Sequence, residues 1–159
     1  MKEALNVGLT EAKRKKVADG LVKLLANNYV LYLKTHNFHW NVVGPMFQPL
    51  HSLFEGQYID LWNAGDTIAE RVRALGFRVP ASYVDFSKLS KIKEVVGIRL
   101  VKAKEMISQL VHDQEVMVRL ARDLLPEVEE VDDQVSVDLL SERMEVHEKN
   151  AWMLRSFLE

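Results

Sequence analysis

The chain has 159 residues, enough for one domain with a complete hydrophobic core. It contains no cysteine, which excludes disulfides, thiol catalysis and cysteine-ligated zinc sites. No apolar run approaches the roughly 18 residues of a membrane-spanning helix, and the formal net charge of -2 gives no general attraction to nucleic acid.

The N-terminal region is predicted to be a short tail over residues 1–9 followed by a long helix. Residues 1–16 lack the apolar block of a secretory signal peptide, so we expect a cytoplasmic protein, with association with the nucleoid left open. Thr10 suits the N-cap position, and the helix is predicted to run from about Thr10 to about His39. Its apolar stripe includes Val17, Leu21, Leu24, Leu25 and Tyr32.

A second long helix is predicted over Gln48–Leu75, after a turn at Gly44-Pro45. Gly76 follows it as a helix-terminating glycine. Apolar residues recur along this segment at gaps of three, four and seven, which is helical spacing, at Leu50, Phe54, Tyr58, Leu61, Ile68, Val72 and Leu75.

The connection from Phe77 to about Lys93 is too long for an unstructured loop in a compact domain. Within it, the sequence SYVDFSKLS predicts a short helix with Ser82 as its N-cap. A third long helix is predicted from about Lys93 to Leu125, where Pro126 is expected to stop it. The residues predicted to face the core on this helix are Val96, Leu100, Ala103, Ile107, Leu110, Val118 and Ala121.

The last helix is predicted to begin at a cap formed by Asp132 or Asp133. It is expected to bury Val135, Leu139, Val146, Met153 and Phe157. The sequence contains no internal repeat and no sign of a second domain, so residues 1–159 are predicted to form a single domain. Four amphipathic helices with one long crossover between the second and third are typical of an all-α four-helix bundle.

Five potential metal ligands stand out: His39, His51, Glu55, Asp66 and Glu70. The last four lie on the second predicted helix as two pairs with i,i+4 spacing, and all four share one stripe. His51 and Asp66 are, however, roughly 22 Å apart along the helix, whereas metal–ligand bonds are about 2 Å long. One helix therefore cannot form one site. Two antiparallel copies across a two-fold axis would bring each His51/Glu55 pair to the partner's Asp66/Glu70 pair.

The mixture of imidazole and carboxylate ligands fits ferrous iron, manganese or zinc. Zinc is usually satisfied with fewer acids, and carboxylates stabilise the ferric ion after oxidation, so the ligand set favours Fe(II)/Fe(III). Iron sites inside a single four-helix bundle use Glu-x-x-His motifs on facing helices. No glutamate in this chain has a histidine three residues later, which favours the shared site over an intrasubunit one.

This pattern resembles the Dps family of mini-ferritins, DNA-binding proteins of starved cells. The family motif is His-Trp-Asn, a second His twelve residues later, an acid four residues further on, and Asp-x-x-x-Glu-Arg. Here it reads His39-Trp40-Asn41, then His51, Glu55, Asp66 and Glu70-Arg71, with every spacing kept. Many members have Asp where this chain has Glu55. The resemblance extends over the whole chain, including the C-terminal HEKNAWMLRSFLE.

The resemblance implies a ferritin-like fold with a short helix in the crossover. It implies a ferroxidase whose sites take His39, His51 and Glu55 from one subunit and Asp66 and Glu70 from its partner. It also implies hydrogen peroxide, rather than oxygen, as the preferred oxidant. Ferric mineral would be stored in a hollow homo-dodecamer, and DNA would be protected from oxidative damage.

Several further residues carry two interpretations each. His36, one turn before His39, is a candidate neighbour of the metal. Trp40 and Trp62 either take up stray oxidising radicals or pack as ordinary aromatic residues. An iron-entry pore or a solvated helix start explains three acids of the last helix equally well: Asp133, Asp138 and Glu142. His112 is expected to be exposed, and His147 to be structural or at a subunit contact.

DNA binding is the alternative main function, in which the shell would chiefly compact the nucleoid. The tail carries only Lys2, balanced by Glu3, and the basic cluster at residues 13–16 falls inside the first predicted helix. A solvated helix start explains that cluster better than a phosphate contact, so DNA binding is not transferred from the family. A third hypothesis is an inert helical shell with a degenerate site, and the five intact ligands argue against it.

Overall fold

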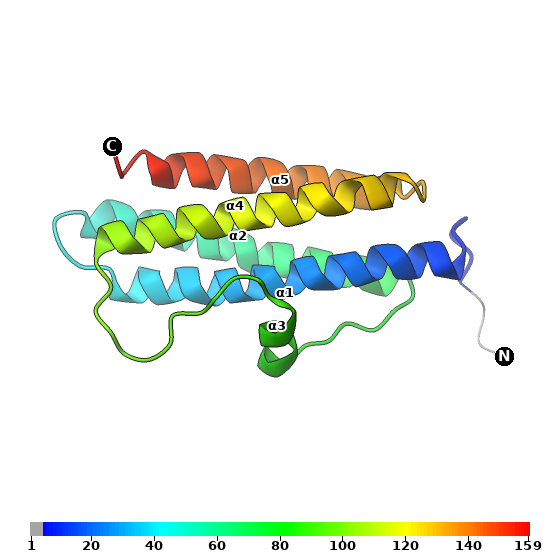
Figure 1. Cartoon of the computed structure of the whole chain (residues 1–159), viewed down its shortest axis with the longest axis horizontal. Helices are drawn as coiled ribbons and strands as arrows, with labels where there is room; N and C mark the ends of the chain where they lie inside the picture. The colour runs from blue at the N-terminus through cyan, green and yellow to red at the C-terminus, as the bar shows by residue number, and fades with distance from the viewer. Residues whose placement is uncertain (1–4) are drawn as a thin grey trace.

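The computed structural model describes residues 5–159, and this described part is all-helical, without a strand. The helices are, in chain order, α1 (Glu11–Asn41), α2 (Phe47–Ala74), α3 (Tyr83–Leu89), α4 (Ala103–Glu129) and α5 (Gln134–Arg155). Figure 1 shows the four long helices side by side, with the short α3 against the outside of α1. The predicted four-helix bundle with a helix in its long crossover is therefore confirmed. The expected tail over residues 1–9 falls partly on residues 1–4, outside the described range.

The first two helices form an antiparallel pair joined by a short loop (Figure 1). The Thr10 hydroxyl accepts a hydrogen bond from the Lys13 backbone N–H at 3.3 Å, which satisfies one of the free donors at the start of α1. Gly44, in the loop, has a φ of 104°, a conformation that side chains other than glycine rarely adopt. The predicted limits of both helices agree with the observed ones to within two residues.

The crossover from α2 to α4 contains α3, as predicted. Ser82 caps this helix by accepting a hydrogen bond from the Asp85 backbone N–H at 3.2 Å. Phe86 is buried and stacks on Tyr29 of α1, with ring centroids 4.7 Å apart. The short helix is thus anchored to the bundle by one aromatic contact and by the buried residue Ile92 that follows it.

The predicted limits of the third long helix were wrong at both ends. Helix α4 begins at Ala103, and Val96 and Leu100, which were predicted to face the core, are exposed. Gly97 has a φ of 80°, which a right-handed helix cannot contain, so the chain between α3 and α4 is irregular. At the other end, Pro126 lies inside the helix, which continues for one more turn to Glu129, where buried Val128 holds that turn in the core.

Asp133 caps α5, as one of the two predicted alternatives, but the face that α5 buries was predicted incorrectly. Val135 is exposed, and of the predicted core residues only Leu139 is fully buried. The buried face consists of Ser136, Leu139, Leu140, Arg143, His147, Ala151 and Leu154. Three of these are polar and have partners inside the bundle: Ser136 bonds Arg71, Arg143 pairs with Asp60, and His147 bonds Gln114. Because these polar residues lie on the inward face of α5, the apolar residues of that face do not show a regular helical spacing in the sequence.

The core is continuous along the bundle and includes fully buried aromatic and aliphatic side chains from all four long helices. Truncating one of them, such as Phe54, to alanine typically costs about 3–5 kcal/mol. None of the helices in the described part has the length and apolar character required to cross a membrane. The bundle thus provides a rigid support for side chains on the outward faces of α1 and α2.

Candidate metal centre

His39 and His51 hold each other in place through a reciprocal pair of hydrogen bonds. His39 Nδ1 is 2.8 Å from the carbonyl oxygen of His51, and His51 Nδ1 is 2.9 Å from the carbonyl oxygen of His39. A carbonyl oxygen only accepts, so both Nδ1 atoms carry the proton. With the proton on Nδ1, the neutral form of each ring has its lone pair on Nε2, and this is the tautomer in which Nε2 can bind a metal.

The backbone positions of these two histidines are fixed by the core. Phe38 and Leu50, which directly precede them, are fully buried. Because successive helical residues are rotated by about 100°, the next side chain on each helix emerges at the edge of the α1–α2 contact. The two imidazoles stack there with centroids 3.7 Å apart and planes 20° apart. The arrangement is held by this packing and by the reciprocal hydrogen bonds.

The other predicted ligands follow His51 along one outward stripe of α2. Glu55, Asp66 and Glu70 are exposed, and no side-chain hydrogen bond or ion pair engages them within residues 5–159. The stripe also contains Ile59 and Trp62, so that its spacing is four, four, three, four and four residues from His51 to Glu70. Ile59 was missed in the sequence, although its position four residues after Glu55 marked it as part of this face.

A single chain does not bring the five predicted ligands together. His39 and His51 are in contact, and Glu55 lies one turn beyond His51, but Asp66 and Glu70 are three to five turns along the same helix. In the described part of the chain, no three His, Asp or Glu side chains converge closely enough to hold a metal ion. Within one chain the predicted ligands therefore lie in two separate groups.

The end of α2 that carries Asp66 and Glu70 is tied to the start of α5. Arg71 donates to Asp133 at 2.6 Å and to Ser136 at 2.9 Å. Burial disfavours the charged form of Asp133, but the hydrogen bonds from Arg71 and Ser136 outweigh it and lower the pKa of this carboxyl. Asp133 is thus a buried cap and ion-pair partner, which differs from both interpretations that the sequence left open, a pore-lining acid and a solvated one.

The two remaining pore candidates lie further along α5. Asp138 is exposed and accepts a hydrogen bond from Gln134, and Glu142 is exposed. Of the two other histidines, His112 is exposed, as expected, and His147 is fully buried inside the chain.

Aromatic rings surround the histidine pair. His36 stacks on Tyr58 and lies against Trp40, each with centroids 3.9 Å apart, and burial lowers the pKa of His36. Trp62 packs on Tyr32 at 5.5 Å. Trp40 and Trp62 nevertheless remain more than half exposed, so the packing interpretation accounts for only part of each ring.

The basic cluster of residues 13–16 is neutralised by contacts within the chain. Lys15 pairs with Asp19 and Lys16 with Glu130, and Lys13 is near Asp132. Arg14 is buried and donates to the carbonyl oxygen of Leu75 at 2.6 Å. The cluster joins α1 to the ends of α2 and α4, so the expected solvated helix start holds for the exposed Lys15 and Lys16 but not for the buried Arg14.

Comparison with known proteins agrees with this architecture. A family model described as a ferritin-like domain matches residues 18–159. A low temperature-induced protein of Nostoc is 43% identical over 98% of this chain and 87% of its own length. A DNA protection during starvation protein of Brevibacillus brevis is 40% identical over 90% of this chain and 95% of its own.

The fold agrees equally well with solved structures. The Dps protein of Vibrio cholerae superposes with a TM-score of 0.92 at 32% identity, covering 100% of this chain and 99% of that one. That protein is described as a member of a broad superfamily of ferritin-like diiron-carboxylate proteins. The chain therefore belongs to the ferritin-like proteins and, among them, to the Dps family.

Proposed function

We propose that this protein oxidises ferrous iron at sites shared by two subunits and stores the ferric product. One observation carries the proposal: the ligand stripe of α2 is symmetric about its own midpoint. An antiparallel second copy pairs position 51 with 70, 55 with 66, and 59 with 62. Each imidazole–carboxylate half-site then meets the partner's Asp66 and Glu70, and the two apolar residues meet at the axis.

The exposed apolar residues support the same pairing. An outward Ile59 beside an outward Trp62 in the middle of a charged stripe is unfavourable in water and is typical of an interaction surface. In this antiparallel pairing, Ile59 is buried against the partner's Trp62, and Trp62 is buried against the partner's Ile59. Because one patch serves both subunits, the contact is isologous and generates two equivalent sites.

The ligand set suits the two oxidation states of iron. Nε2 of His39 and Nε2 of His51 bind Fe(II), and the carboxylates of the partner's Asp66 and Glu70 hold the ion more tightly as its charge rises. We assign one ion to His39, the partner's Asp66 and the partner's Glu70. A second ion is held more loosely by His51 and Glu55. Open coordination positions admit the oxidant.

Two neighbouring ferrous ions supply the two electrons that reduce one molecule of hydrogen peroxide to water, with two protons taken up. No hydroxyl radical is released in this stoichiometry. We propose peroxide as the preferred oxidant, with storage of the ferric mineral in a hollow shell of twelve subunits in the cytoplasm. Removal of both ferrous iron and peroxide protects DNA, which is the role named in relatives such as that of Brevibacillus brevis.

The proposal is tested by loading the assembled protein with ferrous iron under argon and then adding peroxide or oxygen. Ferric absorbance should appear faster than in protein-free buffer, with peroxide faster than oxygen. Equal rates with and without protein would reject the ferroxidase function.

DNA compaction as the main function gains no support from the basic cluster of residues 13–16, because these residues have partners within the chain. A gel-shift assay measures it directly. Retardation with a steep salt dependence would restore this alternative.

A further inference from the structure

A polar groove lies between α1 and α4, on a different part of the bundle from the proposed iron ligands. It has a volume of about 520 Å³, and the segment that follows α3 closes one side of it. None of the five proposed iron ligands lines it, and its walls carry lysines, carboxylates, a histidine and neutral hydrogen-bonding groups. The volume falls in the range of small-molecule sites, roughly 300–1,000 Å³.

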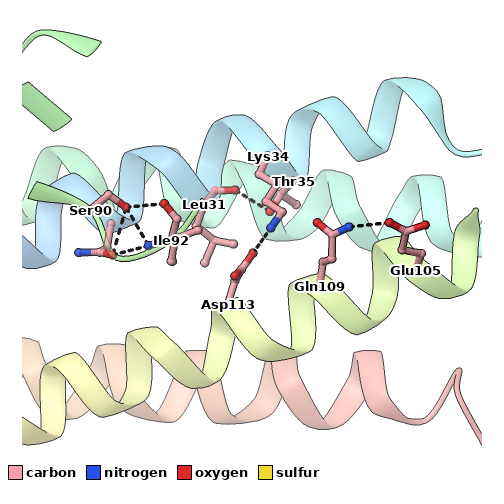
Figure 2. A network of polar contacts seen from close by, with 9 residues as sticks. Leu31, Lys34, Thr35, Ser90, Ile92, Glu105, Gln109 and Asp113 are labelled. Carbon is pink, nitrogen blue, oxygen red and sulfur yellow. Dashed lines mark hydrogen bonds and ion pairs between the residues drawn. The ribbon is translucent and has the colours of Figure 1, made fainter. Parts of the chain in front are cut away.

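The inner wall of the groove is a buried ion pair. Lys34 Nζ of α1 lies 2.6 Å from Asp113 Oδ2 of α4, and their side chains are only 6% and 5% exposed (Figure 2). An ammonium group has three N–H donors, and within residues 5–159 Asp113 is its one side-chain or backbone acceptor. A buried charged donor without an acceptor is costly. The two remaining donors of Lys34 are therefore available to a ligand in the groove that Lys34 lines.

Two more lysines stand at the mouth, on a segment that is firmly attached to α1. The side-chain oxygen of Asn27 accepts hydrogen bonds from the backbone N–H groups of Lys91 and Ile92, at 2.8 and 3.2 Å. Ile92 is buried between Lys91 and Lys93, so the two lysines on either side of it are held at the groove. Neither lysine forms an ion pair with another residue of the described range.

The carboxylates of the groove are already matched by cations. Asp113 pairs with Lys34, and Glu105 accepts from Arg99 at 2.7 Å. The charges of Lys91 and Lys93 therefore remain uncompensated. The two unpaired lysines of the crossover line the same groove as the Lys34–Asp113 pair, and this excess of positive charge favours an anionic ligand.

The α4 wall has the opposite hydrogen-bonding character. The Ser108 hydroxyl donates to the Lys104 carbonyl. The Gln109 amide nitrogen donates to Glu105, as Figure 2 shows. This leaves Ser108 Oγ and Gln109 Oε1 as free acceptors on the wall, beside the second N–H of Gln109. One side of the groove offers charged donors, and the other offers neutral groups that include two acceptors.

We propose that this groove binds a small phosphate monoester with a hydroxylated body. The phosphate lies among Lys34, Lys91 and Lys93, because its oxygens match several ammonium donors better than a single carboxylate does. The hydroxyl groups of the body donate to Ser108 and Gln109. Every residue that lines the groove is polar or charged, and the acceptors Ser108 and Gln109 favour a polyol phosphate over a phosphate whose body has no hydroxyl group.

The test is titration calorimetry of the assembled protein with glycerol 3-phosphate, inorganic phosphate and glycerol as separate probes. Glycerol 3-phosphate should bind saturably at one molecule per chain, inorganic phosphate more weakly, and glycerol not at all. The Lys91→Gln/Lys93→Gln variant should bind on the order of tenfold more weakly, because two ammonium contacts are lost. The matched control is Lys88→Gln/Lys102→Gln, which makes the same change of charge on exposed lysines outside the groove, and it should bind normally.

A second variant tests the orientation of the ligand. Ser108→Ala should weaken binding of glycerol 3-phosphate and leave that of inorganic phosphate unchanged. Equal weakening by both double-lysine variants, or no saturable binding up to about 10 mM, would overturn the proposal. It would also be overturned if Lys91→Gln/Lys93→Gln weakened retardation of duplex DNA while binding of glycerol 3-phosphate stayed unchanged. The lysines would then contact a nucleic-acid backbone instead.

Discussion

Ile59 and Trp62 lie one helical turn apart on α2, midway between the His51/Glu55 pair and the Asp66/Glu70 pair, and are 47% and 56% exposed. Replacing Ile59 with lysine should separate the subunits, because the charge would be buried against the partner's Trp62. Sedimentation should show loss of the twelve-subunit particle, while circular dichroism keeps its helical signal. The control Ile98→Lys changes an equally apolar, fully exposed residue off this stripe. An intact particle in Ile59→Lys would contradict the pairing.

The carboxylates at the far end of α2 should be required for chemistry and not for folding. Asp66→Ala or Glu70→Ala should abolish rapid iron oxidation, because each removes a charged ligand, while helicity and thermal stability stay within about 0.5 kcal/mol of the parent. Stopped-flow ferric absorbance and urea denaturation measure the two quantities. The control Thr67→Ala lies between them on α2 and is exposed. Loss of stability together with activity would make these acids structural.

His147 should govern part of the pH dependence of stability. Burial, aided by the charge of Arg143, lowers its pKa from 6.5 to about 3. Between these two pKa values, the histidine is protonated in the unfolded chain but stays neutral in the folded chain. The free energy of unfolding therefore falls as the pH drops from 6.5 toward about 3. The contribution is about 1.4 kcal/mol per pH unit between pH 6.5 and about 3.

Urea midpoints across this pH range test the role of His147. The His147→Gln variant should be less stable at pH 7, because it loses the contact with Gln114, but its stability should depend less steeply on pH. The exposed His112→Gln should keep the slope of the parent. A slope in His147→Gln equal to that of the parent would assign the acid sensitivity to other groups.

The buried pair of Lys34 and Asp113 should show strong coupling. Asp113→Asn leaves the Lys34 ammonium buried without a counter-charge and should cost about 3–5 kcal/mol of unfolding free energy. The double variant Lys34→Met/Asp113→Leu removes both charges and should recover most of that loss. Urea denaturation of Lys34→Met, Asp113→Leu and the double variant measures the coupling free energy of the pair. Additive losses would show that the pair does not interact in the native protein.

The first three helices were predictable because their signals are local. Thr10 and Ser82 cap the helices that follow them, and the apolar spacing of α2 matches the face that it buries. The start of α4 could not be predicted, because Val96 and Leu100 continue the helical spacing of apolar residues across Gly97, whose backbone cannot be helical. The buried face of α5 was missed because Arg143 and His147 lie inside the bundle.

For the candidate site, the spacing of ligands on one helix was sufficient to predict that one chain does not bring them together, which holds for the described residues. The completion of the site by a second subunit stays a prediction. The reciprocal contact of His39 with His51 was not predictable, since it joins two helices across a turn and depends on their packing. The groove beside Lys34 could not be predicted from the sequence either, because Lys34, Lys91 and Asp113 are far apart in it.

The shared site can be tested by complementation of two inactive proteins. The variants His39→Ala and Asp66→Ala are each expected to be inactive, since every site in either homo-oligomer carries one lesion. When the two are unfolded together and reassembled, random pairing makes about half of the dimers mixed. In a mixed dimer one site receives both lesions and the other receives neither.

The deciding measurement is therefore the rate of iron oxidation by the reassembled mixture, with mass labels to establish that mixed particles form. We predict recovery to about a quarter of the wild-type rate, because about a quarter of all sites regain every ligand by two-fold symmetry. A site within one subunit cannot recover, since neither chain has a complete ligand set. A mixture that contains mixed particles and stays as inactive as its parents would contradict the shared site.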